Sequence, residues 1–95
     1  MVKIMARIAS RDGTSTQMRQ ILHALVGPSR NEPGCIGYEL FQDQDDPLVF
    51  VTIEHWADQS VADAHLATLH VAAAIAQATE LLAQPPIIHR FTPVA

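Results

Sequence analysis

The sequence of 95 residues contains a single cysteine, Cys35, so no disulfide can form within the chain. One free thiol is typical of a protein in a reducing compartment, which predicts a cytoplasmic location. No apolar run approaches the ~18 residues that a membrane-spanning helix needs, and the first residues lack the charged-then-apolar pattern of a secretory signal. We therefore expect a cytoplasmic protein without a membrane segment.

Positive charge is also scarce in this sequence. Six Lys and Arg residues against ten Asp and Glu residues give a formal net charge of -4 at pH 7. Recognition of nucleic acids and of anionic membranes depends on clustered cations, and the six cations here are scattered along the chain. The sequence therefore predicts neither a nucleic-acid partner nor a membrane partner.

Hydrophobic residues, in contrast, make up 48% of the chain. A chain of this length favours a single domain over residues 1–95, and it contains no repeat, low-complexity tract or linker. A lone domain of this size buries only somewhat more than ~60% of its unfolded surface. Surplus apolar surface on a small domain is usually buried against a second copy, so we expect a homodimer.

The first third of the chain predicts a strand followed by a helix. Apolar residues alternate with other residues over residues 2–9, which is the period of a strand. Thr14, with Gln17 three residues later, resembles a capping box at the start of a helix. Apolar residues then recur at helical spacing over residues 18–26, and the Gly-Pro pair at 27–28 is expected to end or sharply loosen that helix.

The rest of the chain predicts a hairpin, helical segments and a last strand. Residues 35–42 and 48–56 have strand composition, and the short acidic segment between them predicts an antiparallel hairpin. Asp58 and Thr68 are expected to cap two helical segments, of which the second runs to about Ala83. With a final strand over residues 87–91, the order becomes βαββαβ. This is the ferredoxin-like α+β unit with an antiparallel sheet.

The predicted strand over residues 48–56 is apolar on both faces. Phe50 lies on one face, and Val51 and Ile53 lie on the other. Because the helices of such a unit cover only one face of its sheet, the other face needs a partner, which again predicts a homodimer. His55 shares the face of Val51 and Ile53, so we place it at the dimer interface.

The polar end of this strand carries the first candidates for chemistry. The indole of Trp56 offers a flat apolar wall with one N–H donor, which suits an aromatic ligand, although a lone tryptophan can equally be core filler. Glu54 lies on the same face, and a carboxylate there needs a partner if it is buried. A salt bridge or an exposed strand end is the simpler alternative for Glu54.

Two histidines follow, and histidine is the natural proton acceptor near neutral pH. We expect His65 to share the sheet-facing side of its helix with Ala62 and Leu69. On one straight helix His65 and His70 would point about 140° apart, so they converge only if the helix breaks near Thr68. A purely structural role is an equal alternative for each histidine.

Other chemistries find little support in the sequence. A helical two-histidine metal site needs i, i+4 spacing or a tight turn, which the histidine spacings do not offer, so no metal is expected. Cys35 lies in an apolar strand without a helix N-terminus nearby and is expected to be an inert small hydrophobe. Neither a glycine-rich phosphate loop nor a dinucleotide fingerprint is present.

Several short motifs together resemble the antibiotic biosynthesis monooxygenase (ABM) domain family, which includes the YgiN-like quinol monooxygenases. They are Glu32-Pro33-Gly34-Cys35, Tyr38-Glu39-Leu40, Glu54-His55-Trp56, Asp58, His65 and His70-Val71. Each motif alone is weak, but their joint occurrence in this order on a βαββαβ pattern is fairly specific. The resemblance implies a dimeric α+β barrel, in which two ferredoxin-like units join through their sheets.

The resemblance also implies oxygenation of a small aromatic quinol or phenol by dioxygen, without metal, flavin or haem. An electron-rich phenolate can pass an electron directly to dioxygen, so the protein must remove a proton, stabilise an oxyanion and exclude water. We therefore expect a cofactor-independent monooxygenase. Its expected catalytic residues are Glu54, His65 and Trp56. Its expected substrate-binding residues are Thr52, Tyr38, Phe50 and His70.

Alternatives to this function remain open. Thr52 stands where the characterised polyketide oxygenases of the family have an asparagine, and threonine has no amide. A second hypothesis is a non-catalytic ligand-binding or stress-related dimeric barrel. A third is an isomerase of a small phosphorylated carbonyl compound, which would need Arg7 or Arg90 as a phosphate anchor. The haem-degrading branch of the fold is disfavoured because the last helix lacks a suitably placed histidine.

Overall fold

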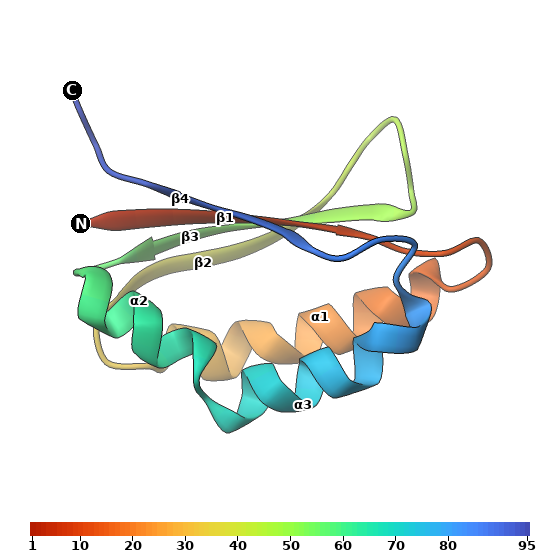
Figure 1. Ribbon diagram of the computed structural model, residues 1–95, viewed down its shortest axis with the longest axis horizontal. Coiled ribbons are helices and arrows are strands. Elements are labelled where there is room, and N and C mark those ends of the chain that lie inside the picture. The colour runs from red at the N-terminus through yellow and green to blue at the C-terminus, as the bar shows by residue number, and fades with distance from the viewer.

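The computed structural model describes all 95 residues, which form a four-stranded antiparallel sheet and a layer of helices (Figure 1). In chain order the elements are β1 (Val2–Ala9), α1 (Ser15–Arg30), β2 (Cys35–Gln42), β3 (Val49–Trp56), α2 (Gln59–Leu66), α3 (Leu69–Ala78), the 3-10 helix η1 (Thr79–Leu81) and β4 (Ile87–Phe91). The strand order across the sheet is β2-β3-β1-β4. The predicted ferredoxin-like α+β fold is confirmed.

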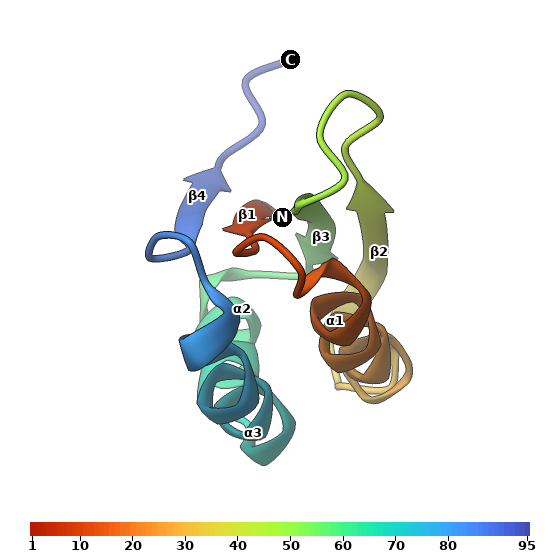
Figure 2. The same cartoon turned by 90° about the vertical axis from the view of Figure 1, so that its right-hand side faces the viewer.

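The helices all lie on one side of the sheet, as Figure 2 shows in a view turned by 90°. The other side of the sheet carries no helix.

None of the helices combines the length and the apolar composition that crossing a bilayer would require.

The central strands β1 and β3 alternate between these two sides. Their antiparallel register pairs the side chains that face the helices: Val2 with Trp56, Ile4 with Glu54, Ala6 with Thr52, and Ile8 with Phe50. Seven of these eight residues are buried and Ala6 is partly buried. The alternation predicted for β3 is therefore present, and it directs Thr52, Glu54 and Trp56 toward the helices.

Two apolar clusters fill the space between the sheet and the helices. The larger cluster packs Ile8 and Phe50 against residues of α1 and α3. The smaller cluster joins Val2, Ile4, Tyr38, Trp56 and Ala62 near the other end of β3. Because Thr52 and Glu54 lie between Phe50 and Trp56 along β3, buried polar groups separate the two clusters.

The side of the sheet without helices is rich in apolar side chains. Val51 and Ile53 lie at its centre and are partly buried, while Phe41 and Phe91 toward its edges are 48% and 47% exposed. His55 pairs with Lys3 on this same face, as its position in the sequence predicts. The face of β3 without helices is thus largely apolar and has no cover within the chain, whereas the other face combines Phe50 and Trp56 with the polar Thr52 and Glu54.

Helix α1 differs from the prediction at both ends. The helix continues through Pro28 to Arg30. Asn31 N–H bonds Gly27 O within the last turn, and Arg30 Nε donates to Tyr38 O of β2, so a tertiary contact helps to offset the missing proline N–H. At the start of α1, Thr14 does not form the predicted capping box. Its hydroxyl instead donates to backbone oxygens of the preceding turn and of η1.

Helix α3 ends at Ala78 rather than near Ala83, and the short helix η1 follows it. The backbone groups beyond the helix find partners at the end of β1 instead. Arg11 N–H bonds Leu81 O, and Ala83 N–H bonds Ala9 O. These hydrogen bonds compete with a further helical turn, so tertiary pairing decides where the helix stops.

Glycine substitutions test how the turns set this fold. Gly34 has φ +82, and an added Cβ would lie 2.7 Å from Val61 Cγ1, whereas Gly13 has φ +80 in open space. We expect Gly13→Ala to lower the free energy of unfolding by about 1–2 kcal/mol through backbone strain, and Gly34→Ala to lower it further through the clash. Gly27→Ala, in α1 with open space around it, is expected to raise the free energy by about 0.5–1 kcal/mol. Urea unfolding measures all three, and an equal loss for Gly13→Ala and Gly34→Ala would refute the packing contribution.

Candidate active site

The residue Glu54 carries a buried carboxylate, with only 3% of the residue exposed. Thr52 Oγ1 donates a hydrogen bond to Glu54 Oε2 at 2.7 Å, and Trp56 Nε1 donates to Glu54 Oε1 at 3.0 Å. The three side chains share one face because residues two apart in a strand point the same way. β3 therefore supplies the buried charge together with two donors that reduce the cost of burying it.

His65 reaches this carboxylate from α2. Its Nε2 lies 3.5 Å from Glu54 Oε1, and its Nδ1 lies 2.7 Å from Glu32 Oε2. The imidazole also packs against Trp56, with ring centroids 4.5 Å apart, and against Tyr38, with centroids 5.6 Å apart. His65 is thus held between two carboxylates and two aromatic rings, and the residue is 2% exposed.

The cluster continues outward through Glu32, which lies in the turn before β2. The same Oε2 atom that meets His65 lies 2.8 Å from His70 Nε2. The side chain of Glu32 is 11% exposed and that of His70 is 27% exposed. The contacts therefore form a continuous polar chain from Glu54 in the interior, through His65 and Glu32, to His70 near the surface.

A break between two helices brings the two histidines together. α2 ends at Leu66 and α3 begins at Leu69, with Thr68 Oγ1 donating to His65 O and accepting from Val71 N–H. Both predicted caps are confirmed, since Asp58 Oδ1 likewise accepts from Val61 N–H. The break near Thr68, which was the condition for convergence, is also present.

Leu69 is the exception to the predicted helix face. It was expected beside His65 on the sheet-facing side, but it is 89% exposed. The prediction was wrong because it extended one helical period across residues 66–69, where the chain changes direction.

Five of the expected substrate-binding and catalytic residues gather around His65. They are Thr52, Glu54, Trp56, Tyr38 and His70. Phe50, which was expected to line the same site, lies in the larger apolar cluster with residues of α1 and α3. Glu32 joins the site although the sequence indicated it only as part of a turn motif. The sequence could not identify Glu32 because its role depends on the contact with His65, which lies 33 residues further along the chain.

The contact between His65 and Glu54 allows a shared proton to lie on either side chain. A neutral His65 that donates from Nδ1 to Glu32 presents an unprotonated Nε2 to the Glu54 carboxylate. That contact is favourable only when one of the two groups carries a further proton, either as imidazolium or as a carboxylic acid. The arrangement is therefore suited to accepting or releasing a proton beside the indole of Trp56.

The single tyrosine and the single cysteine of the chain are both held in their protonated forms. Burial, and then the negative charge of Glu54 on the neighbouring strand, raise the pKa of Tyr38 well above its ordinary value. Burial, and then the charge of Glu32, raise the pKa of the Cys35 thiol. These shifts agree with an unreactive cysteine and make Tyr38 an aromatic wall beside His65 rather than a base.

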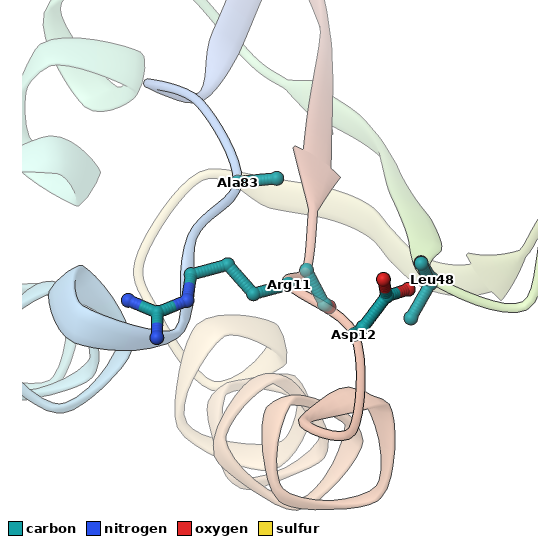
Figure 3. A pocket seen from close by; sticks show the side chains of 5 residues that line it. Arg11, Asp12, Leu48 and Ala83 are labelled. Atoms are coloured by element: carbon teal, nitrogen blue, oxygen red, sulfur yellow. The ribbon is translucent and has the colours of Figure 1, made fainter.

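One surface depression lies away from this cluster. It has a volume of about 540 Å³ and is lined by Ser10, Arg11, Asp12, Leu48 and Ala83 (Figure 3). Figure 3 shows Arg11 extending away from Asp12, and its guanidinium donates to Glu80 O. This depression contains no acid–base pair of the kind found at His65.

A smaller cavity of about 160 Å³ lies between α1 and α3. Its lining residues are Ile21, Ala24, Leu25, His70, Ala73, Ala74 and Gln77. His70 therefore connects the polar chain to an apolar groove on the helical side of the protein.

The isomerase hypothesis requires Arg7 or Arg90 as a phosphate anchor, and neither arginine joins this cluster. Arg90 Nη1 lies 2.7 Å from Asp63 Oδ1, and Arg90 is exposed. Arg7 pairs with Val51 and Ile87 in the register, which places it on the sheet face without helices. Neither arginine forms a hydrogen bond or an ion pair with a residue of the cluster, so the isomerase hypothesis loses its motivation.

An alkaline titration tests the electrostatic environment of this site. Because Tyr38 is the only tyrosine, its ionisation can be followed directly by absorbance. We expect no tyrosinate in the folded protein near pH 10, and its appearance at once on unfolding in denaturant. Since the folded pKa is raised, the folded state retains the proton that the unfolded state releases, so stability falls as pH rises above 10. A tyrosinate midpoint near pH 10 with an unchanged circular dichroism spectrum would contradict this environment.

Comparison with known proteins gives the same fold and assigns a family. The family model described as antibiotic biosynthesis monooxygenase matches residues 1–77. Rv0793 of Mycobacterium tuberculosis is 29% identical over 93 residues, covering 98% of this chain and 91% of that protein, and its solved structure gives a TM-score of 0.93. A crystal structure described as an antibiotic biosynthesis monooxygenase is 30% identical, with a TM-score of 0.94 and complete coverage of both chains.

One further relative shares only part of its length with this chain. The protein sll1783 of Synechocystis is 33% identical over 60 residues, which cover 63% of this chain and 41% of that protein. The chain thus spans less than half the length of that relative. The family model, in contrast, covers most of the present sequence, so the chain belongs to the antibiotic biosynthesis monooxygenase family.

Proposed function

We propose that the chain is a homodimeric monooxygenase that oxidises a small phenol or quinol with dioxygen, using His65 and Glu54 to accept the substrate proton. Membership of the family supports a monooxygenase-like function in general. The observation that carries the finer proposal is the buried His65 imidazole, held between Glu54 and Glu32 beside Trp56. Such a group combines a proton acceptor with an aromatic wall.

The proposed reaction begins with transfer of the phenolic proton to the His65–Glu54 pair. The phenolate passes one electron to dioxygen, the resulting radicals combine to form a C–O bond, and loss of water leaves a carbonyl. A phenol with a free para C–H and one dioxygen thus yield a quinone and one water, so no external reductant is needed. Burial of the cluster would keep water from the reactive pair.

Access to the cluster requires a movement, because Trp56, Glu54 and His65 are all buried in this conformation. We propose that α2 moves away from the sheet to admit the substrate. Short segments bound this helix at both ends, and Asp58 and Thr68 cap the two helix starts on either side of His65. A rotation at these junctions would displace His65 without disturbing β3.

Oxygen consumption tests the proposed reaction. The metal-free protein is expected to turn over at least one member of a panel of hydroquinones and anthrones above the buffer rate. Glu54→Gln keeps the size of the side chain but removes the carboxylate, so we expect the rate to fall by about 10²–10⁴-fold. The matched control Glu80→Gln, at an exposed position in η1, is expected to keep the full rate. An absence of turnover with every compound, or full activity of Glu54→Gln, would refute the proposal.

A non-catalytic ligand-binding barrel is the second candidate, and one observation favours it. Glu54, His65, Glu32 and His70 already contact one another in a continuous chain, so none of these side chains requires a ligand as its partner. In that case His65→Ala would lower the free energy of unfolding without changing any oxygen consumption. Ligands would then quench the fluorescence of Trp56 but would not be converted.

The proposed homodimer would form through the sheet face that has no helices. Its apolar side chains, including Phe41 and Phe91, are too exposed for an isolated domain to leave in water without cost. Joining two such faces is also the arrangement that family membership suggests. The partner copy would bury Val51, Ile53 and His55.

Sedimentation velocity tests this interface with a matched pair of substitutions. Phe41→Asp, on the face without helices, is expected to weaken dimerisation by at least about tenfold because it buries an unpaired charge in the interface. Ile75→Asp, at a 60% exposed apolar position on α3, is expected to leave the dimer intact. A wild-type protein that sediments as a folded monomer would refute the proposed dimer.

A further inference from the structure

Three potential ligand atoms converge at the outer end of the polar chain. Glu32 Oε2 lies 2.7 Å from His65 Nδ1 and 2.8 Å from His70 Nε2, and the three atoms all lie within 4.8 Å of one another. The side chains come from three separate elements: the turn before β2, helix α2 and the first turn of α3. Two imidazole nitrogens and one carboxylate oxygen are therefore directed toward the same small region.

We propose that Glu32, His65 and His70 form a binding site for one divalent transition-metal ion, of which Zn²⁺, Co²⁺ and Ni²⁺ are the best matches. In tetrahedral geometry, imidazole and carboxylate ligands lie about 2.0–2.2 Å from zinc, so two ligands of one ion lie about 3.3–3.6 Å apart. The two contacts of Glu32 Oε2, at 2.7 Å and 2.8 Å, would widen by about 0.5–0.9 Å on binding, and the two imidazole nitrogens, which lie within 4.8 Å of each other, would move to the same separation. Two nitrogen ligands select these ions over Mg²⁺ and Ca²⁺, which prefer oxygen.

The surroundings of His65 supply the support that a metal-bound histidine requires. A ligating Nδ1 carries no proton, so the proton of His65 lies on Nε2, which faces Glu54 Oε1 at 3.5 Å. Thr52 and Trp56 hold that carboxylate in place. Carboxylate–histidine–metal arrangements of this kind fix the orientation of the ring and strengthen the ligand.

The charge balance of the cluster points the same way. Glu32 and Glu54 bring two carboxylates into a largely buried space, and both of their histidine contacts can be neutral imidazoles. A dication would compensate both negative charges at once, which no lysine or arginine does through a hydrogen bond or an ion pair to either carboxylate.

The ion would have a route to the site and an open coordination position. The side chain of His70 is 27% exposed and lines the cavity of about 160 Å³ between α1 and α3. Water from this cavity would complete the coordination. Three protein ligands with one open position are typical of catalytic rather than structural zinc sites.

This inference is independent of the proposed oxygenation, because it concerns binding of the ion alone. A metal on Nδ1 would fix the proton of His65 on Nε2 and prevent it from accepting another. Metal occupancy and proton acceptance are therefore alternative states of the same residue, and the oxygen assay uses metal-free protein for that reason.

Isothermal titration calorimetry with Zn²⁺ tests the site in the untagged chain after removal of metal by a chelator. We expect one ion per chain, and with Co²⁺ a visible absorption band of a low-symmetry nitrogen- and oxygen-ligated ion. Glu32→Gln and His70→Ala are each expected to weaken binding by about a hundredfold or more. Both residues are less buried than His65, so these variants should fold.

Matched controls separate the site from ordinary surface histidines. His23→Ala on α1 and His89→Ala on β4 remove exposed histidines and are expected to leave the affinity unchanged. Glu54→Gln removes the carboxylate support of His65 together with one of the two negative charges, and should weaken binding by about 10–100-fold. The proposal fails if no saturable binding occurs, if Glu32→Gln and His70→Ala bind as tightly as the wild type, or if the loss follows His23 or His89 instead.

Discussion

The buried carboxylate of Glu54 is the constraint on which the rest of the structure depends. An ionised carboxylate cannot lie between two apolar clusters without donors, and β3 supplies only two, from Thr52 and Trp56. The remaining partner must come from the helical layer, and His65 of α2 provides it. The position of α2 over the end of the sheet is therefore set by a polar requirement as much as by apolar packing.

The position of His65 in turn decides the path of the chain around it. Its second nitrogen meets Glu32, and that contact ties the turn before β2 to α2. His70 can reach the same oxygen only because the chain breaks at Thr68, whose side chain bonds backbone groups of both helices. The groups best suited to chemistry are thus the groups that hold the helices on the sheet, and a substitution among them would alter stability and function together.

Local patterns were sufficient to predict most of the fold, because strand and helix periods depend on neighbouring residues. The ranges of β1, β2 and β4, the caps at Asp58 and Thr68, and the shared face of Glu54 and Trp56 all follow from such patterns. The errors occur where distant contacts decide. α1 passes Pro28 because its last turn is held by β2, and Glu32 became a site residue through a histidine 33 positions away. A sequence pattern contains no information about which of several acids a buried histidine will meet.

The alternation of side chains along β3 links the polar cluster around His65 to the apolar sheet face through which the proposed dimer would form. Glu54 and Trp56 point into the polar cluster, while Ile53 and His55 between and beside them point to the face without helices. A shift of β3 along its axis by one residue would exchange these two sets, placing a carboxylate on the apolar face and an isoleucine against His65. The register that builds the cluster is therefore the register that builds the apolar face. Pairing of that face with a second copy would stabilise the same register, so dimerisation would hold the site in place without contributing a residue to it.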